Sequence, residues 1–147
     1  MTLILSLQAA LQPYEWIGIL IARLSVGVLF ALSGTGKLFV ASRREEMVRT
    51  LRAAGIPAPA VNAIVASSVE CLFGTLLAIG FLTPLACVML SGVMIVALAT
   101  TALPAVKAPS FTAWLGSVLY LPEVLYVVIL TWLLLSGPGR LSVDALF

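Results

Sequence analysis

The chain has 147 residues, of which 62% are hydrophobic and 10% are charged, and its formal net charge is +2. A soluble domain is about half apolar and about a quarter charged, so this chain lacks the polar groups to cover a water-exposed surface. The composition therefore excludes an ordinary soluble domain and a nucleic-acid-binding surface, and it indicates an integral membrane protein.

The N-terminal stretch "MTLILSLQAALQP" is apolar but has no basic region before its apolar run, so it does not have the form of a cleaved signal peptide. We expect it to lie along the membrane interface or against the spanning helices. The first span is expected over 16–36. Small residues such as Gly27 and Gly34 in this span, and Gly74 in the next, predict close packing between helices.

The end of the first span, "ALSGTGKLF", looks at first like a phosphate-binding loop. Such a loop needs a glycine where Ala31 stands, a serine or threonine where Leu38 stands, and a strand before it. All three features are missing. The stretch is better interpreted as the end of a packed helix, with the stem of Lys37 reaching toward the membrane boundary.

The segment "SRREEMVRTLRAAGIP" between the first two spans predicts a short amphipathic helix. Ser42 and Glu45 have the spacing of a capping box, and Gly55 and Pro57 mark the helix end. Its apolar stripe suits a position on the membrane surface. There it serves either as a lipid or partner contact or simply as a solvated connector.

Three further apolar stretches are expected to span the membrane, at 61–80, 84–103 and 114–135. Each has about 20 residues, which as a helix rises about 30 Å and crosses the hydrocarbon core. Together with the first span they predict one all-α domain over 1–147. The expected architecture is an integral membrane four-helix bundle with a short interfacial helix between its first two spans.

Prolines give local detail in the later spans. Thr83 followed by Pro84 predicts an N-cap and the first helical position of the third span. Pro122 is expected near the start of the fourth span, where it would kink the helix and leave the carbonyl of Val118 without its helical partner. That carbonyl could then bond a side chain, a water or a ligand.

Basic residues are distributed unequally between the two ends of the predicted spans. Four arginines lie between the first and second spans, and Lys107 lies between the third and fourth. Because basic residues in short loops favour the cytoplasm, these connections are expected inside and both termini outside.

Ionisable residues inside a membrane are costly and are functional candidates by default. Arg23, Glu70 and Glu123 fall within the predicted spans, Lys37 lies at the edge of one, and their formal charges cancel. Depths calculated from the helical rise allow Arg23 to pair with Glu70 and Lys37 to pair with Glu123, or all four to form one cluster. Such pairs either only fix the helix register or line a polar pocket for a quinone head group, a proton or a small polar substrate. Three further polar side chains are candidate neighbours of this cluster: Ser67, Tyr120 and Tyr126.

Several kinds of chemistry lack their residues. The sequence has no histidine, so a bis-histidine haem and a histidine-rich metal site are excluded. Cys71 and Cys87 do not form a Cys-x-x-Cys pair, and we interpret both as small buried residues. No metal site is expected, and no cofactor held by ligands of this chain.

The chain also resembles the DoxX family of small bacterial membrane proteins. Four stretches carry the resemblance in order: "RLSVGVLFALSGTGKLF", "AAGIPAPAV", "VECLFGTLLAIGFLTPLA" and "LSGPGRLSVDALF". It covers about residues 20–147 and implies a four-helix membrane bundle with Arg23, Lys37, Glu70 and Glu123 at family-typical positions. The chain departs from many relatives in having "ALPAVKAP" where they have a histidine near the end of the third span, so any role of that histidine is absent here.

The resemblance implies a link to membrane redox complexes, since the family takes its name from a subunit of a thiosulfate:quinone oxidoreductase. The leading hypothesis is an inner-membrane accessory subunit that anchors an oxidoreductase partner and binds quinone near the charged cluster, rather than a catalyst alone. Glu70 or Glu123 would then carry protons. The alternatives are a transport or binding module for small solutes or lipids, and a purely structural assembly factor. An oligomer is compatible with all three.

Overall fold

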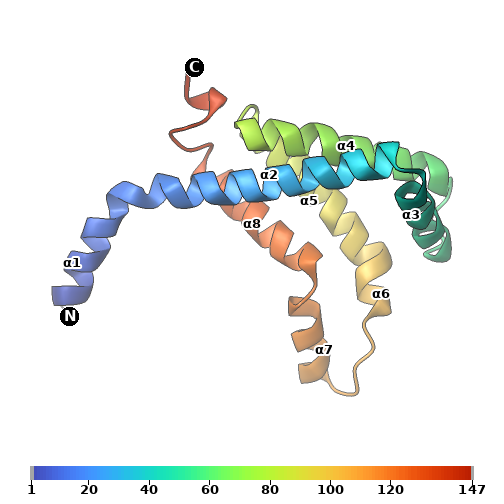
Figure 1. Cartoon of the computed structure of the whole chain (residues 1–147). Helices are drawn as coiled ribbons and strands as arrows, with labels where there is room; N and C mark the ends of the chain where they lie inside the picture. The colour runs from blue at the N-terminus through green and yellow to red at the C-terminus, as the bar shows by residue number, and fades with distance from the viewer. Residues whose placement is uncertain (1, 147) are drawn as a thin grey trace.

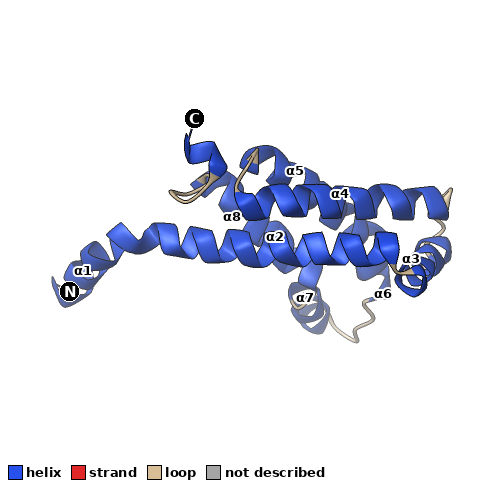
Figure 2. Ribbon diagram, turned by 45° about the horizontal axis from the view of Figure 1, so that its top comes forward, coloured by secondary structure: helices blue, strands red, loops and turns tan. Residues whose placement is uncertain are grey.

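The computed structural model describes residues 2–146, with the side chains of residues 2–5 and 8 left aside. Within that range the secondary structure is helical and contains no strand, which confirms the predicted all-α class. The outermost residues of the predicted domain, 1 and 147, lie outside the described part. The elements follow in chain order (Figures 1 and 2): α1 (Thr2–Leu11), η1 (Gln12–Tyr14), α2 (Glu15–Phe39), α3 (Ala41–Ala53), α4 (Pro59–Ile79), α5 (Thr83–Ala97), η2 (Leu98–Ala102), α6 (Leu103–Ala105), α7 (Phe111–Leu119), α8 (Pro122–Ser136) and η3 (Val143–Leu146).

Three helical stretches of the described chain are long and apolar enough to cross a membrane. They are Ala9–Phe39, which contains α2, then α4, and then Thr83–Ala105, which joins α5, η2 and α6. These agree within a few residues with the first three predicted spans, except that the first begins earlier. In Figure 1, α1 bends away from the other helices at η1.

The fourth predicted span is broken in two. α7 and α8 together pass the same test of length and hydropathy, but they are bent by 59° at the residues between them. Pro122 stands in the first turn of α8, so it begins a new helix instead of kinking a continuous one. The prediction of a free carbonyl at Val118 is wrong, because Leu121 N donates to Val118 O at 3.1 Å where α7 ends.

α2 and α4 lie side by side (Figure 2). Their backbones come closest at glycines. A Cβ added to Gly27 would lie 2.6 Å from the backbone nitrogen of Ala78, and one added to Gly74 would lie 2.5 Å from that of Ala31. Only glycine allows such an approach of two helix backbones, which confirms the predicted small-residue interface. The register is antiparallel, and Gly34 faces Cys71.

The remaining core lies between α5 and α8 and the α2–α4 pair. Leu77, Leu90, Leu130 and Leu133 are fully buried there. Outward-facing positions are also apolar, and Leu32, for example, is 65% exposed. A protein whose outward-facing side chains are as apolar as its core is suited to lipid contact rather than to water.

α3 confirms the predicted helix between the first two spans, and Figure 1 shows it at the end of the α2–α4 pair. The predicted capping box is not formed: the helix begins one residue earlier than Ser42, after the extended residue Val40, with no side-chain cap. Gly55, with φ +73°, follows the helix as expected. The position of α3 on a membrane surface stays a prediction.

Candidate functional site

Lys37 and Glu70 form an ion pair between α2 and α4. Lys37 Nζ lies 2.7 Å from Glu70 Oε2 and 2.9 Å from Oε1. Ser33 Oγ also donates to Oε2, at 3.1 Å. The Glu70 side chain is 3% exposed and the Lys37 side chain 27%, so the lysine closes the outer end of a buried carboxylate site.

The predicted pairing of Arg23 with Glu70, and of Lys37 with Glu123, is wrong. Because Gly34 faces Cys71 in the antiparallel register, Glu70 lies opposite the last turns of α2, next to Lys37. Arg23 precedes Lys37 by 14 residues, which is about 21 Å along the same helix. The depths calculated from helical rise treat each span alone, so they could not give the register between α2 and α4.

Arg23 instead binds the C-terminal segment. Its Nη1 donates to Pro138 O at 2.6 Å, its Nη2 donates to Leu141 O, and the residue is 2% exposed. Gly80, with φ +72°, leaves room for this contact, because a Cβ there would overlap the guanidinium group. The segment after α8 is thereby held over the turn between α4 and α5.

Asp144 completes this contact between the C-terminal segment and the helices. Its Oδ1 accepts from Leu82 N and its Oδ2 from Thr83 N, both at 2.8 Å, so it caps the start of α5. Thr83 had been predicted as the N-cap; the cap is in fact a carboxylate from a segment 61 residues later. Sequence analysis missed Asp144, since nothing local links it to α5.

The cap predicts a pH dependence. Partial burial raises the pKa of Asp144, but hydrogen bonds from Thr83 and Leu82 and the charge of Arg23 outweigh it and leave the pKa below the ordinary value of 3.8. A carboxylate with a lowered pKa stabilises the fold above its unfolded pKa, and the contribution is lost as the pH falls through the folded pKa.

We therefore expect Asp144→Asn to lower the free energy of unfolding by about 1 kcal/mol at pH 7. The difference from the wild-type protein should begin to shrink below about pH 4, near the pKa of an unfolded aspartate, and should disappear only below the lowered folded pKa, where Asp144 is neutral too. Thermal unfolding of both proteins in the same detergent at pH 7 and pH 3 measures this. An equal difference at both pH values would show that the charge contributes nothing.

A pocket of about 670 Å³ brings together three of the four predicted charged residues: Lys37, Glu70 and Glu123. It opens between α3 and α4 on one side and α5 and η2 on the other. Most of its wall is apolar, and the side chains that give this character include Leu51, Val65, Val69, Met89, Val93 and Met94. An apolar pocket of this size with a few convergent polar groups is the usual form of a small-molecule site.

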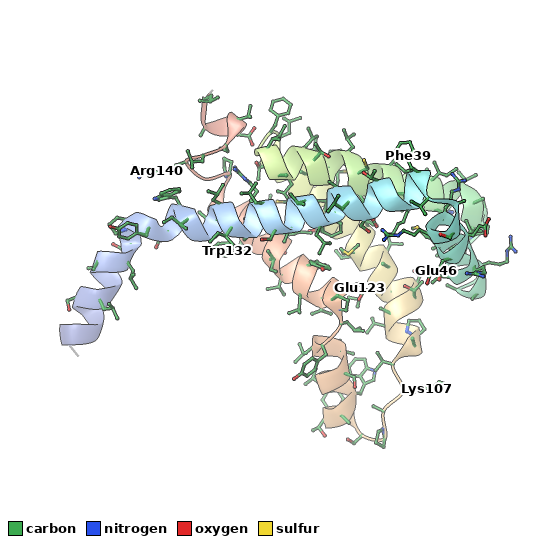
Figure 3. All side chains as sticks on the ribbon, in the orientation of Figure 1. Phe39, Glu46, Lys107, Glu123, Trp132 and Arg140 are labelled. Carbon is green, nitrogen blue, oxygen red and sulfur yellow. The ribbon has the colours of Figure 1, made fainter. Side chains whose placement is uncertain are left out.

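Glu123 contributes a carboxylate without a protein partner. It lies in the first turn of α8 (Figure 3), and its Oε2 atom is buried but has no hydrogen-bond partner. A buried polar atom without a partner costs free energy unless a ligand, a water or a proton satisfies it. Its position on the pocket wall makes a bound ligand one natural partner.

The wall opposite Glu70 contains a π-helical turn, η2. Thr100 Oγ1 donates to Val96 O and Thr101 Oγ1 to Ala97 O, both at 2.7 Å, and both threonines line the pocket. π-turns are rare and occur often at functional sites. This turn adds two hydroxyl groups to an otherwise apolar wall.

The other predicted site residues lie elsewhere. Ser67 is 1% exposed and its hydroxyl lies 3.5 Å from the sulfur of Met47, outside the pocket wall. Tyr126 packs edge-to-face against Phe30 in the core. Tyr120 is 85% exposed. Neither tyrosine lines the pocket: Tyr120 follows α7, which is bent away from α8, and Tyr126 on α8 packs into the core.

The described residues contain no group of three or more His, Cys, Asp or Glu side chains that could hold a metal ion. In comparisons with known proteins, the DoxX family model matches residues 18–103, more than half of the chain. Neither the search of curated proteins nor the search of solved structures found a match to this chain.

Proposed function

Because the chain belongs to the DoxX family, we propose that it is a membrane-embedded subunit of a redox complex whose pocket binds a quinone. The observation that supports this most is the placing of the Lys37–Glu70 ion pair and the unpartnered Glu123 oxygen in one otherwise apolar pocket. A quinone likewise combines polar and apolar parts, because it has two carbonyl oxygens on a ring and an apolar tail.

The polar residues would orient the ring. The ammonium group of Lys37 can donate to a quinone carbonyl, as can Glu70 or Glu123 when protonated. The apolar wall formed by α4 and α5 would take the tail, and Met89 and Met94 there adapt easily to its shape. Val88 on this wall is 54% exposed, which leaves the tail a path to the lipid.

The partner would supply the electrons. The chain would anchor a catalytic subunit whose cofactor is oxidised as the quinone is reduced, so it acts as an accessory subunit in the inner membrane. In this arrangement the bent α7–α8 pair serves as the fourth element of the bundle, and α3 lies on the cytoplasmic membrane surface. The termini then lie on the opposite side.

Quinone binding by the purified protein tests the proposal. We expect Glu70→Gln and Glu123→Gln each to weaken binding of a short-chain ubiquinone by about three- to tenfold, because an amide N–H is a weaker donor to a quinone oxygen than the O–H of a protonated carboxyl group. Glu45→Gln, on the exposed side of α3, is the matched control and should bind like the wild-type protein. Equilibrium dialysis in detergent gives the dissociation constants, and circular dichroism checks the fold.

Two outcomes would count against the proposal. If the wild-type protein binds no ubiquinone or menaquinone analogue, the pocket has another ligand, such as a lipid. If both pocket variants bind as tightly as Glu45→Gln, quinone binds somewhere other than at these carboxylates.

A further inference from the structure

A second cavity lies beside the quinone pocket and differs from it in character. It has a volume of about 340 Å³ and lies between the last turns of α2 and the inner side of α3. All but one of its lining residues carry a charged or hydroxyl group: Ser33, Lys37, Arg43, Glu46, Met47 and Thr50. We call it the α3 cavity; Figure 3 labels Glu46 on α3.

Glu70 lies between the two cavities. Ser33 and Lys37 line the α3 cavity, and both donate hydrogen bonds to the carboxylate of Glu70, which itself lines the quinone pocket. Lys37 lines both spaces. A proton reaching Ser33 or Lys37 is therefore one hydrogen bond from Glu70.

The α3 cavity can hold water. Its volume is several times larger than the volume of about 30 Å³ that one water molecule occupies in the liquid. Besides Lys37, four of its side chains offer charged or hydroxyl groups that could bond such a water. The guanidinium group of Arg43 lies against Gly36, where an added Cβ would be 2.6 Å from its Nη1. Arg43 therefore places a basic group on the wall of the cavity next to α2.

The charged groups around Glu70 come from three elements. Lys37 reaches it from α2, Arg43 and Glu46 line the α3 cavity from α3, and Glu123 of α8 lies on the wall of the quinone pocket. Lys37 and Ser33 donate hydrogen bonds to the Glu70 side chain and hold it between the two cavities. Glu46 adds a second acidic side chain to the wall of the α3 cavity.

We propose that the α3 cavity is the aqueous route by which protons reach the quinone pocket, and that Glu70 is the group that passes them. This rests on the proposed function. Reduction of a quinone to a quinol takes two electrons and two protons. The electrons come from the reduced cofactor of the partner. Glu70 takes one proton from water in the α3 cavity, gives it to a reduced quinone oxygen, and is reloaded from the cavity for the second.

Thiol labelling tests the route without any quinone. In a protein with Cys71→Ala and Cys87→Ala, Ser33→Cys should react with a charged, membrane-impermeant thiol reagent from the α3 side of the membrane only. The matched control is Ser67→Cys, which replaces a serine of 1% exposure outside both cavities. We expect it to react at least about tenfold more slowly, because thiol reactivity needs exposure to water. Labelling from the opposite side, or no faster than the control, would overturn the route.

A pH jump tests the role of Glu70 in proteoliposomes containing bound ubiquinone. Acidification on the α3 side should change quinone affinity, acidification on the other side should not, and Glu70→Gln should abolish the response. A response that persists in Glu70→Gln would remove this residue from the route. Glu70→Asp keeps the carboxylate and serves as the control for misfolding. If Ser33→Cys is labelled as expected but no quinone binds, the cavity stands and the proposed function fails. If quinone binds but the cavity is closed to the reagent, only the proton route fails.

Discussion

Replacing Lys37 with methionine is expected to lower the free energy of unfolding by about 3 kcal/mol, the low end of the range for breaking a buried ion pair. The change leaves the carboxylate of Glu70, 3% exposed, without its cation. The low end applies because the lysine itself is 27% exposed and already in part solvated. Thermal or denaturant unfolding in one detergent measures the loss.

A double substitution separates the pair from the loss of side-chain contacts. Lys37→Met with Glu70→Gln removes both charges, so it should recover most of the stability that Lys37→Met loses. Lys107→Met, outside the described spans in the loop before α7, is the control and should change stability by less than about 0.5 kcal/mol. A double variant as unstable as Lys37→Met would show that charge burial is not the cause.

Replacing Arg23 with leucine is expected to release the C-terminal segment. The buried guanidinium group donates to Pro138 O and Leu141 O, and hydrogen bonds to a charged group are worth about 1.5–3 kcal/mol. Arg140 is exposed in this segment, so trypsin cleavage after it reports the release. We expect cleavage to become about ten- to a hundredfold faster, in proportion to the loss of that free energy.

Two controls show whether the effect is local. Arg52→Leu removes an exposed arginine of α3 and should leave cleavage after Arg140 unchanged. Lys37→Met destabilises the far end of the same α2–α4 pair, so it should accelerate this cleavage much less than Arg23→Leu does. Equal acceleration by both would mean that trypsin reports global unfolding and that Arg23 has no special hold on the segment.

The two cations of α2 that bond other elements lie in different parts of the helix and have different partners. Arg23, near its start, ties the C-terminal segment and the start of α5 to the helix pair. Lys37, near its end, belongs to a pocket with a ligand's worth of space. The close α2–α4 contact through glycines sets the position of Lys37 relative to Glu70. The rest of the pocket wall comes from α3, α5, η2 and the start of α8.

Local sequence was enough to identify what the helices are made of. Runs of about 20 apolar residues predict membrane helices because unsatisfied backbone groups are too costly in lipid. The glycines predicted a close helix pair, and Gly27 and Gly74 form it. The expectation that opposite charges in the spans pair with each other holds for Glu70, which pairs with Lys37, but not for Arg23, which bonds backbone carbonyls.

The sequence by itself therefore predicted a helical membrane protein, the three continuous helical stretches that are long and apolar enough to span, and the ionisable side chains that need partners. Only the tertiary structure decided who those partners are: Lys37 for Glu70, and backbone carbonyls of the C-terminal segment for Arg23. The reason is that hydropathy and helical rise are properties of one segment. A partner depends on the register between antiparallel helices and on where a distant segment such as that of Asp144 returns, and both arise from packing across the whole chain.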